Sequence, residues 1–467
     1  MGFATPAFVS LFLPVTLGLC VLARGRLRAQ NVILLAASLL FYAWGEPVYI
    51  LLLLALALGN GLLARRIAVS HARKASVLTA LAVAINLGIL FAFKYIGFFA
   101  DTFHQLTGIL LPLPRPRLPL GISFFTFQAL SYVLDVRRGV TKPADSLWML
   151  LLYLCFFPQL IAGPILQWNQ VKDQLYARGI TGEGVSRGLR RFIVGLSKKL
   201  LLADVLGGIA DAAFACPAHA LGAPLAWYGA IAYTLQIYLD FSGYSDMAIG
   251  MGHMFGFHFP ENFRYPLRAG GMQAFWRRWH ITLTDWFRSY LYIPLGGNRR
   301  GKPRTYRNMA IVFLFTGLWH GASWTFVLWG AWNGLFCILE YAGIIRVRRW
   351  PAWLAHLYTL AVVALGFVLF RSPGVGAAGV YLRAMCLNWQ ATPLRMSYFL
   401  EQCSPMRLTL LLASGAVSVD AFRRAGRLLA ARPWGRAGMY AASLLLLLCA
   451  YTAMVASEYH PFIYFRF

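Results

Sequence analysis

The run Met309-Ala-Ile-Val-Phe-Leu-Phe-Thr-Gly-Leu-Trp-His320 decides how the chain is interpreted, because it places an ionisable ring after eleven largely apolar residues. As a helix, those residues extend about 16 Å, roughly half of a hydrocarbon core that is ~30 Å thick. An ionisable group buried in hydrocarbon is costly unless it faces a polar cavity. The run therefore predicts a membrane helix that carries a functional histidine.

The composition extends this interpretation to the whole chain. Of its 467 residues, 59% are hydrophobic and 13% are charged, whereas soluble proteins have roughly 45–50% apolar and about 25% charged residues. We therefore predict an all-α polytopic membrane protein with about eleven to thirteen membrane segments, some of them re-entrant. The candidate segments are 6–23, 31–44, 48–64, 76–94, 119–135, 147–163, 200–215, 227–247, 309–319, 324–345, 355–370, 408–419 and 439–456.

The net charge of +27 is explained by basic clusters in the loops between the apolar runs. These clusters are 24–28, 65–74, 137–142, 172–199, 264–307, 346–349 and 423–436. Placing them all in the cytoplasm puts both termini on the opposite side, and no nucleic-acid partner is implied. Segment 147–163 lies between two such clusters and contains Pro158 and Gly163-Pro164, which interrupt a helix. We expect it to enter the membrane and return on the same side, surrounded by protein.

A second histidine lies in the basic but aromatic-rich stretch 264–307. Aromatic and leucine residues recur there at helical steps, and the expected apolar face is Trp276, Trp279, Leu283, Trp286, Phe287 and Tyr290. His280 falls on the same face. The pattern predicts one amphipathic helix in the cytoplasmic interface, which ends at Pro294 and is followed by the turn 295–300. His280 is either part of a site or a structural histidine bonded to backbone.

The surroundings of His320 suit general-base chemistry. Gly317 and Gly321 are small enough to let a substrate or another backbone come close. A neutral imidazole reachable from the cytoplasm can accept a proton from a reacting group. The alternative is a packed core histidine.

Other polar residues also lie in apolar runs. Asp240 and Asp246 share the segment 227–247, where they either bond neighbouring helices or line a cavity. Asn333 is placed to orient a substrate carbonyl or to pack. A metal site has little support, since the seven cysteines are scattered singly and no histidine cluster has ligand spacing. The sequence also lacks the G-x-S-x-G elbow, the phosphate loop and the dinucleotide fingerprint, which leaves serine hydrolases, ATP-driven pumps and dehydrogenases without support.

Several blocks together resemble the membrane-bound O-acyltransferase family, and within it the bacterial alginate O-acetyltransferase branch. The blocks are 118–127 (LPLGISFFTF), 156–164 (FFPQLIAGP), 240–246 (DFSGYSD), 275–280 (FWRRWH), 292–299 (YIPLGGNR), 317–322 (GLWHGA) and the ending 462–467 (FIYFRF). The resemblance implies one transmembrane domain around a central funnel. Its parts would be N-terminal spans at 1–117, a catalytic core at 118–345 and C-terminal spans at 346–467.

The resemblance also implies an activity. It is the transfer of an acetyl group from a cytoplasmic thioester, acetyl-CoA, to a hydroxyl reached from the other side of the inner membrane, with no tightly bound cofactor and no metal. His320 matches the invariant histidine of the family, and His280 matches its second polar position. The expected substrate-binding or supporting residues are Trp276, Arg277, Asp240, Asp246, Asn298, Trp319 and Asn333. A periplasmic partner would receive the acetyl group, and both termini would be periplasmic.

Two alternatives to this interpretation stay open. The acceptor polymer is expected to be alginate, but related bacterial members acylate cellulose, peptidoglycan or, with D-alanine, teichoic acid. In a different class, a transporter or flippase would use His320, Asp240 and Asp246 as a proton or substrate path. Such proteins often contain inverted repeats, and none is visible in the sequence.

Overall fold

The computed structural model describes residues 2–421, 428, 432–456 and 460–463. Every regular element in these ranges is helical, so the prediction of an all-α protein is confirmed. Residues 464–467 of the expected C-terminal block lie outside the described residues, as do Arg423, Arg424 and Arg427 of the last basic cluster.

Five helical stretches within the described residues are long and apolar enough to cross a membrane. They are α2 (Leu27–Gly45), α3 (Tyr49–Val69), the stretch Ala72–Thr107, α17 (Ala352–Arg371) and Ala437–Ala456 in α22 (Pro433–Ala456). The expectation of a multi-pass membrane protein is thereby confirmed. Helices also occupy the other predicted segments, but they are shorter or less apolar, and the count of eleven to thirteen stays a prediction.

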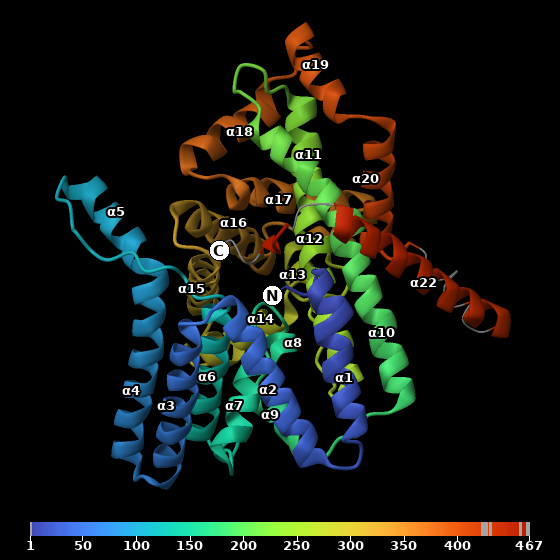
Figure 1. Ribbon diagram of the computed structural model, residues 1–467. Helices are drawn as coiled ribbons and strands as arrows, with labels where there is room; N and C mark the ends of the chain where they lie inside the picture. The colour runs from blue at the N-terminus through green and yellow to red at the C-terminus, as the bar shows by residue number, and fades with distance from the viewer. Residues whose placement is uncertain (1, 422–427, 429–431, 457–459, 464–467) are drawn as a thin grey trace. The chain divides into compact units, whose positions relative to one another are not determined.

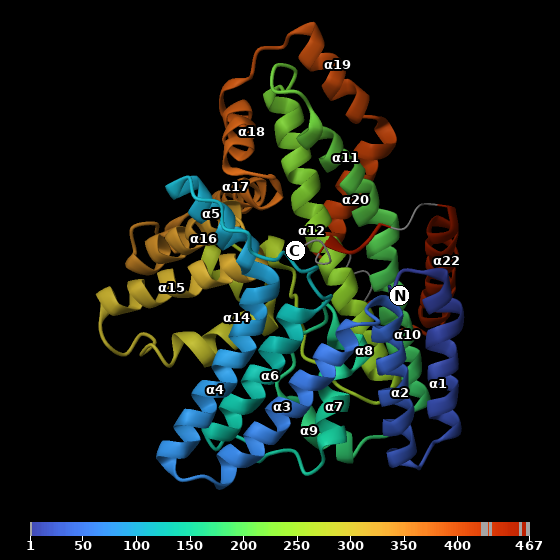
Figure 2. The ribbon, with the colours of Figure 1, turned by 60° about the vertical axis from the view of Figure 1, so that its left-hand side comes forward.

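The chain divides into two compact units, and the first comprises residues up to Phe192 together with Tyr244–Glu261. Besides α2 and α3 it contains η1 (Phe8–Phe12), α1 (Leu13–Leu22), α4 (Ala72–Leu90), η2 (Phe91–Tyr95), α5 (Ile96–Thr107), α6 (Ile122–Arg137), α7 (Leu147–Cys155), α8 (Phe157–Leu160) and α9 (Trp168–Tyr176). Helices α3, α4 and α6 pack against one another, and α3 and α4 lie side by side in both views (Figure 1, Figure 2).

The segment expected to re-enter the membrane is a broken helix, as its prolines predict. Helix α7 ends at Cys155, Phe156 has a non-helical ψ of 110°, and α8 lasts only four residues. The break frees the backbone N–H of Phe157, which donates to Ser38 Oγ of α2 at 3.1 Å. A neighbouring helix therefore satisfies the interrupted backbone, the condition for irregular structure at membrane depth. The return to the same side stays a prediction.

The second unit comprises Ile193–Gly243 and the chain from Asn262 onward. Its elements besides α17 and α22 are η3 (Lys198–Ala203), α11 (Asp204–Ala215), η4 (Pro266–Arg268), α13 (Met272–Trp276), α14 (Ile281–Phe287), η5 (Arg288–Tyr292), α15 (Lys302–His320), α16 (Trp324–Ala342), η6 (Val347–Arg349), α18 (Val375–Leu387), α19 (Pro393–Gln402) and α20 (Pro405–Ser418). Helices α10 (Gly182–Ser197) and α12 (Ala223–Met254) contribute residues to both units. The predicted boundaries at 117 and 345 are not those of the two units, and the three-part division stays a prediction.

The predicted continuous helix around His280 is wrong. Helix α13 ends at Trp276, His280 adopts a left-handed φ of 43°, and α14 begins at Ile281. Backbone hydrogen bonds to the segment that precedes α13 explain the break. The N–H of Ile281 donates to the Asn262 carbonyl at 2.9 Å, and the N–H of Arg264 donates to the Arg278 carbonyl at 3.0 Å. These bonds replace helical ones, so His280 lies in a turn. The helical stretch does end before Pro294, as expected.

Candidate active site

Glycines bring α15 and α16 into backbone contact and so fix the end of α15. A Cβ added to Gly317 would lie 2.4 Å from the carbonyl oxygen of Phe326, and one added to Gly330 would lie 2.4 Å from that of Phe313. Gly321 lies against the Phe326 ring. Gly317 and Gly321 were expected to admit either a substrate or another part of the chain. The structure shows the second, because α15 and α16 pack side by side at these glycines (Figure 1, Figure 2).

His320 is the last residue of α15 and is 2% exposed. Its ring centroid lies 5.0 Å from that of Trp319, 4.9 Å from Trp329 and 5.4 Å from Phe370. Three different segments supply these rings: the α15 terminus, α16 and α17. The imidazole is thus held in an aromatic cluster, and any reaction at it occurs out of bulk water.

Trp319 also contacts the second histidine. The ring centroids of Trp319 and His280 lie 5.9 Å apart, and His280 is 0% exposed. The centroid of Phe241 on α12 lies 4.7 Å from that of His280 in an edge-on arrangement. The structure thus places His280 and His320 in one aromatic cluster with Trp319 between them, although they are 40 residues apart in the sequence.

Asn262 belongs to this site and was missed in the sequence. Its side-chain Oδ1 lies 3.1 Å from His280 Nδ1 and accepts a hydrogen bond from Thr282 Oγ1 at 2.9 Å. Asn262 is 0% exposed. It precedes His280 by 18 positions, outside the expected helix, so no helical spacing could have connected the two residues.

Trp276 lies in the same cluster through α16. Its ring centroid is 5.8 Å from that of Trp329 and 5.3 Å from that of Phe313. Its buried indole N–H has no hydrogen-bond partner among the described residues. A buried donor without a partner is costly, so this group is suited to bind an acceptor atom of a substrate.

Glu340 positions the helix that carries Trp276, and it was also missed in the sequence. Its Oε1 accepts the backbone N–H of Met272 at 2.6 Å, and its Oε2 accepts that of Gln273 at 3.0 Å. Helix α13 has only five residues, too few to be stable alone. A carboxylate on its first N–H groups satisfies donors that the helix itself leaves unpaired.

Asp240 lies in a buried ion network. Lys199 Nζ lies 2.8 Å from Asp240 Oδ1 and 2.7 Å from Asp204 Oδ1. The other oxygen of Asp240 accepts the backbone N–H of Ile463 at 2.9 Å. This network joins η3, α11 and α12 to the chain close to its C-terminus, and it favours a structural role for Asp240.

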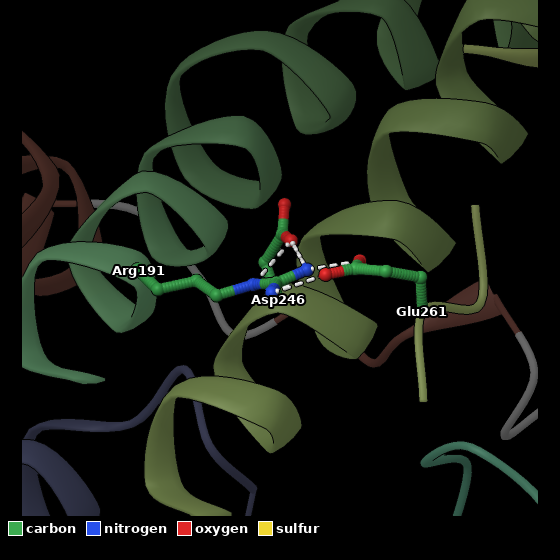
Figure 3. Close-up of polar contacts among 3 residues, drawn as sticks. All are labelled: Arg191, Asp246 and Glu261. Atoms are coloured by element: carbon green, nitrogen blue, oxygen red, sulfur yellow. Dashed lines mark hydrogen bonds and ion pairs between the residues drawn. The ribbon is translucent and has the colours of Figure 1, made fainter. Parts of the chain in front are cut away.

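Asp246 is on the same helix but belongs to the first compact unit, where it binds a different cation. Its Oδ1 accepts hydrogen bonds from Arg191 Nε at 3.0 Å and Nη2 at 2.9 Å (Figure 3). Glu261 accepts two more from the same guanidinium, from Nη1 at 2.7 Å and from Nη2 at 2.5 Å. The two aspartates, which share the predicted segment 227–247, therefore have separate ionic partners. The arrangement favours helix-to-helix bonding for Asp246.

Three other predicted residues are placed as follows. Asn333 is buried in α16 and its Nδ2 donates to the Trp329 carbonyl at 2.8 Å, an intrahelical bond. Arg277 is exposed, and its Nε donates to the Gln273 carbonyl. Asn298 is exposed in the turn after η5. No group of three or more His, Cys, Asp or Glu residues suited to a metal ion occurs in the described part of the chain.

Comparison with known proteins identifies the class to which this fold and site belong. Residues 145–370 match the membrane-bound O-acyltransferase family, a range that contains both histidines. The probable alginate O-acetylase of Pseudomonas putida is 37% identical over 100% of both chains. The peptidoglycan O-acetyltransferase of Helicobacter pylori is 36% identical over 82% of this chain and 79% of its own.

A more distant relative has a related chemistry. The teichoic acid D-alanyltransferase of Bacillus subtilis is 26% identical over 61% of this chain and 78% of its own. The chain belongs to the membrane-bound O-acyltransferase family, and it is a multi-pass membrane O-acyltransferase. The resemblance seen in the sequence blocks is thereby confirmed.

Proposed function

We propose that this enzyme transfers an acetyl group from acetyl-CoA, supplied in the cytoplasm, for the O-acetylation of a cell-surface polysaccharide, with alginate as the first candidate. The observation that carries the proposal is the cluster of His280, His320, Trp276 and Trp319 in a chain that matches an alginate O-acetylase over its full length. Both imidazoles are buried, where a proton-accepting group is protected from bulk water.

In the proposed reaction, His320 is the general base. A ring nitrogen takes the proton of the acceptor hydroxyl as its oxygen attacks the thioester carbonyl carbon. The new C–O bond forms, the C–S bond breaks, and the electron pair leaves with the sulfur of coenzyme A. The indole N–H of Trp276 donates to the carbonyl oxygen, where negative charge develops. His280 either polarises that carbonyl or positions the donor.

The donor is proposed to approach from the basic side of the chain. Two pairs of exposed arginines lie near the site in the sequence. Arg277 and Arg278 follow α13, which carries Trp276, and Arg299 and Arg300 lie in the turn after η5. Exposed guanidinium groups attract the phosphates of a coenzyme A thioester. This orientation puts the basic loops in the cytoplasm, the protein in the inner membrane and both termini in the periplasm. A periplasmic partner protein would then receive the acetyl group and pass it to the polymer.

Purified protein in sealed lipid vesicles with radiolabelled acetyl-CoA tests the chemistry. Wild type should cleave the thioester, and His320→Ala should lose about 10²–10⁴-fold of the transfer rate, the range of general-base catalysis. His104→Ala, at an exposed histidine, is the matched control and should keep wild-type transfer. Near wild-type turnover by His320→Ala would refute the assigned role. Uptake of label into vesicles without thioester cleavage would instead support the transporter alternative.

The acceptor is tested in cells that lack this chain. Loss of base-labile acetate from alginate supports the first candidate, which rests on the name of the Pseudomonas relative. Loss of acetate from peptidoglycan or cellulose, or of D-alanine esters from teichoic acid, would assign the enzyme to another polymer. The first and last of these three outcomes correspond to the Helicobacter and Bacillus relatives.

A further inference from the structure

The side chain of Asn262 has a determined orientation at the start of α14. Its Oδ1 lies 3.3 Å from the backbone nitrogen of Thr282, as well as 2.9 Å from Thr282 Oγ1. A backbone N–H is only a donor. The amide atom that faces Thr282 must therefore be the oxygen and not the nitrogen.

The same oxygen faces His280. It lies 3.1 Å from His280 Nδ1, and neither residue is exposed to solvent. The ring cannot easily turn away, because the left-handed backbone of His280 is held by the bond from the Ile281 N–H to the Asn262 carbonyl. The Phe241 ring packs edge-on against the imidazole. Asn262 thus presents an acceptor to Nδ1 in a fixed arrangement.

The charge state of His280 follows from its surroundings. Phe241 on α12, Phe263 and Trp319 at the end of α15 surround the ring, and none of these side chains is charged. The turn that carries His280 is outside the five stretches that can cross a membrane. Burial lowers the pKa of its imidazole to about 3. The ring is therefore neutral near pH 7 and carries one N–H and one lone pair.

We infer that Asn262 is a positioning residue that holds the proton of His280 on Nδ1, so that Nε2 accepts a hydrogen bond from a substrate N–H or O–H. This inference rests on the acyltransferase function proposed above. A neutral ring in this tautomer has no N–H at Nε2 to donate to a thioester carbonyl. Of the two proposed roles for His280, positioning the donor is consequently the one that the geometry selects, and polarisation of the carbonyl falls to the Trp276 N–H.

Nitrogen NMR of protein with ¹⁵N-labelled histidine, in bilayers at pH 7, measures the tautomer directly. Protonated and unprotonated ring nitrogens have well-separated shifts, and the signals absent from a His280→Gln sample belong to His280. We expect Nδ1 protonated and Nε2 unprotonated. A ring with its proton on Nε2, or with both nitrogens protonated, would overturn the inference.

Two variants separate tautomer control from simple support of the turn. Asn262→Leu removes the acceptor that faces Nδ1, and it should shift the His280 signals toward the other tautomer and lower kcat roughly tenfold, the value of one hydrogen bond. Thr282→Val is the matched control: it removes the hydroxyl that donates to Asn262 Oδ1 but leaves Asn262 in place. It should keep both the Nδ1–H signal and near wild-type kcat.

The outcomes distinguish this inference from the proposed function. Equal losses of kcat in both variants with unchanged His280 signals would show that Asn262 only supports the turn. If Asn262→Leu fails to fold, the wild-type spectrum still decides the tautomer. Wild-type protein that shows the Nδ1–H signal but cleaves no acetyl-CoA would refute the proposed function and leave the tautomer assignment standing.

Discussion

Lys199 Nζ lies 2.8 Å from Asp240 Oδ1, and both side chains are only 3% exposed. The ammonium also binds Asp204, whose side chain is 18% exposed, so one cation of the second unit compensates one buried and one partly buried carboxylate. Asp240 in addition accepts the backbone N–H of Ile463. The pairing explains how an aspartate can lie within a largely apolar helix, since a buried charge is tolerated where an opposite charge and hydrogen bonds accompany it.

Lys199→Met should strongly destabilise the protein. The substitution keeps the apolar stem but leaves the buried Asp240 and the partly buried Asp204 without their cation. Removal of one partner of a buried pair typically costs about 3–5 kcal/mol. Thermal unfolding in detergent, followed by fluorescence-detected size exclusion, measures the effect. Arg187→Met breaks the exposed pair with Glu183, whose side chains are 58% and 80% exposed, and should change little. Equal midpoints for the two variants would contradict the assignment of a stabilising network.

Glu340→Gln should lower the activity more than the stability. An amide keeps one acceptor oxygen for the α13 backbone but turns an NH₂ group toward the other N–H, so the first turn of α13 moves and carries Trp276 with it. We expect kcat to fall roughly tenfold, equivalent to one hydrogen bond, with a small change in the unfolding midpoint. Radiolabelled acetyl transfer and thermal unfolding are measured on the same samples.

Glu183→Gln is the matched control for that variant, because it makes the same chemical change at an exposed helix position. It should leave kcat and the unfolding midpoint unchanged. Wild-type kcat in Glu340→Gln would show that the bonds to Met272 and Gln273 do not position the site.

The sequence predicts the fold class and singles out two histidines that the structure brings into one aromatic cluster, but it does not predict the residues that contact them. Apolar runs of membrane length and the prolines near Phe156 predict spans and a broken helix from local chemistry alone. His280 was placed on a continuous helix because its aromatic neighbours keep a helical period. The break is set by bonds to Asn262 and Arg264, which lie earlier in the chain. Long-range hydrogen bonds of this kind leave no periodic signal.

The same limit applies to the polar residues. Asp240 and Asp246 lie six positions apart in one apolar run, which suggests a shared purpose, yet each is bound by a different cation from elsewhere in the chain. Lys199 and Arg191 belong to a basic cluster that was interpreted only as a topology signal. Glu340 lies in the predicted segment 324–345, where no local pattern marks it. Spacing identifies which residues share a helix, whereas tertiary pairing decides what each of them does.

Gly330→Ala should push α15 away from α16 and disturb His320. The added Cβ would lie 2.4 Å from the Phe313 carbonyl oxygen, so a backbone must move. Overpacking of this kind typically costs about 1–3 kcal/mol, and acetyl transfer should fall with it. Gly208→Ala is the control, since a Cβ there meets nothing within 4 Å; in a helix it should be neutral or slightly stabilising. A Gly330→Ala protein as stable and active as wild type would contradict the close packing of these helices.

Trp276→Phe tests whether the indole N–H acts in the reaction. Phenylalanine keeps an aromatic ring against Trp329 and Phe313 but removes the buried donor that has no partner among the described residues. If that N–H stabilises charge on the thioester oxygen in the transition state, kcat should fall about 10²–10³-fold, as when one such donor is lost from an oxyanion hole. KM for acetyl-CoA should change little, because the bond strengthens only as the reaction proceeds. Trp353→Phe, at a position that is 69% exposed, makes the same chemical change away from the site and should have no effect. A Trp276→Phe enzyme with wild-type kcat and raised KM would show instead that the indole only binds the donor in its ground state.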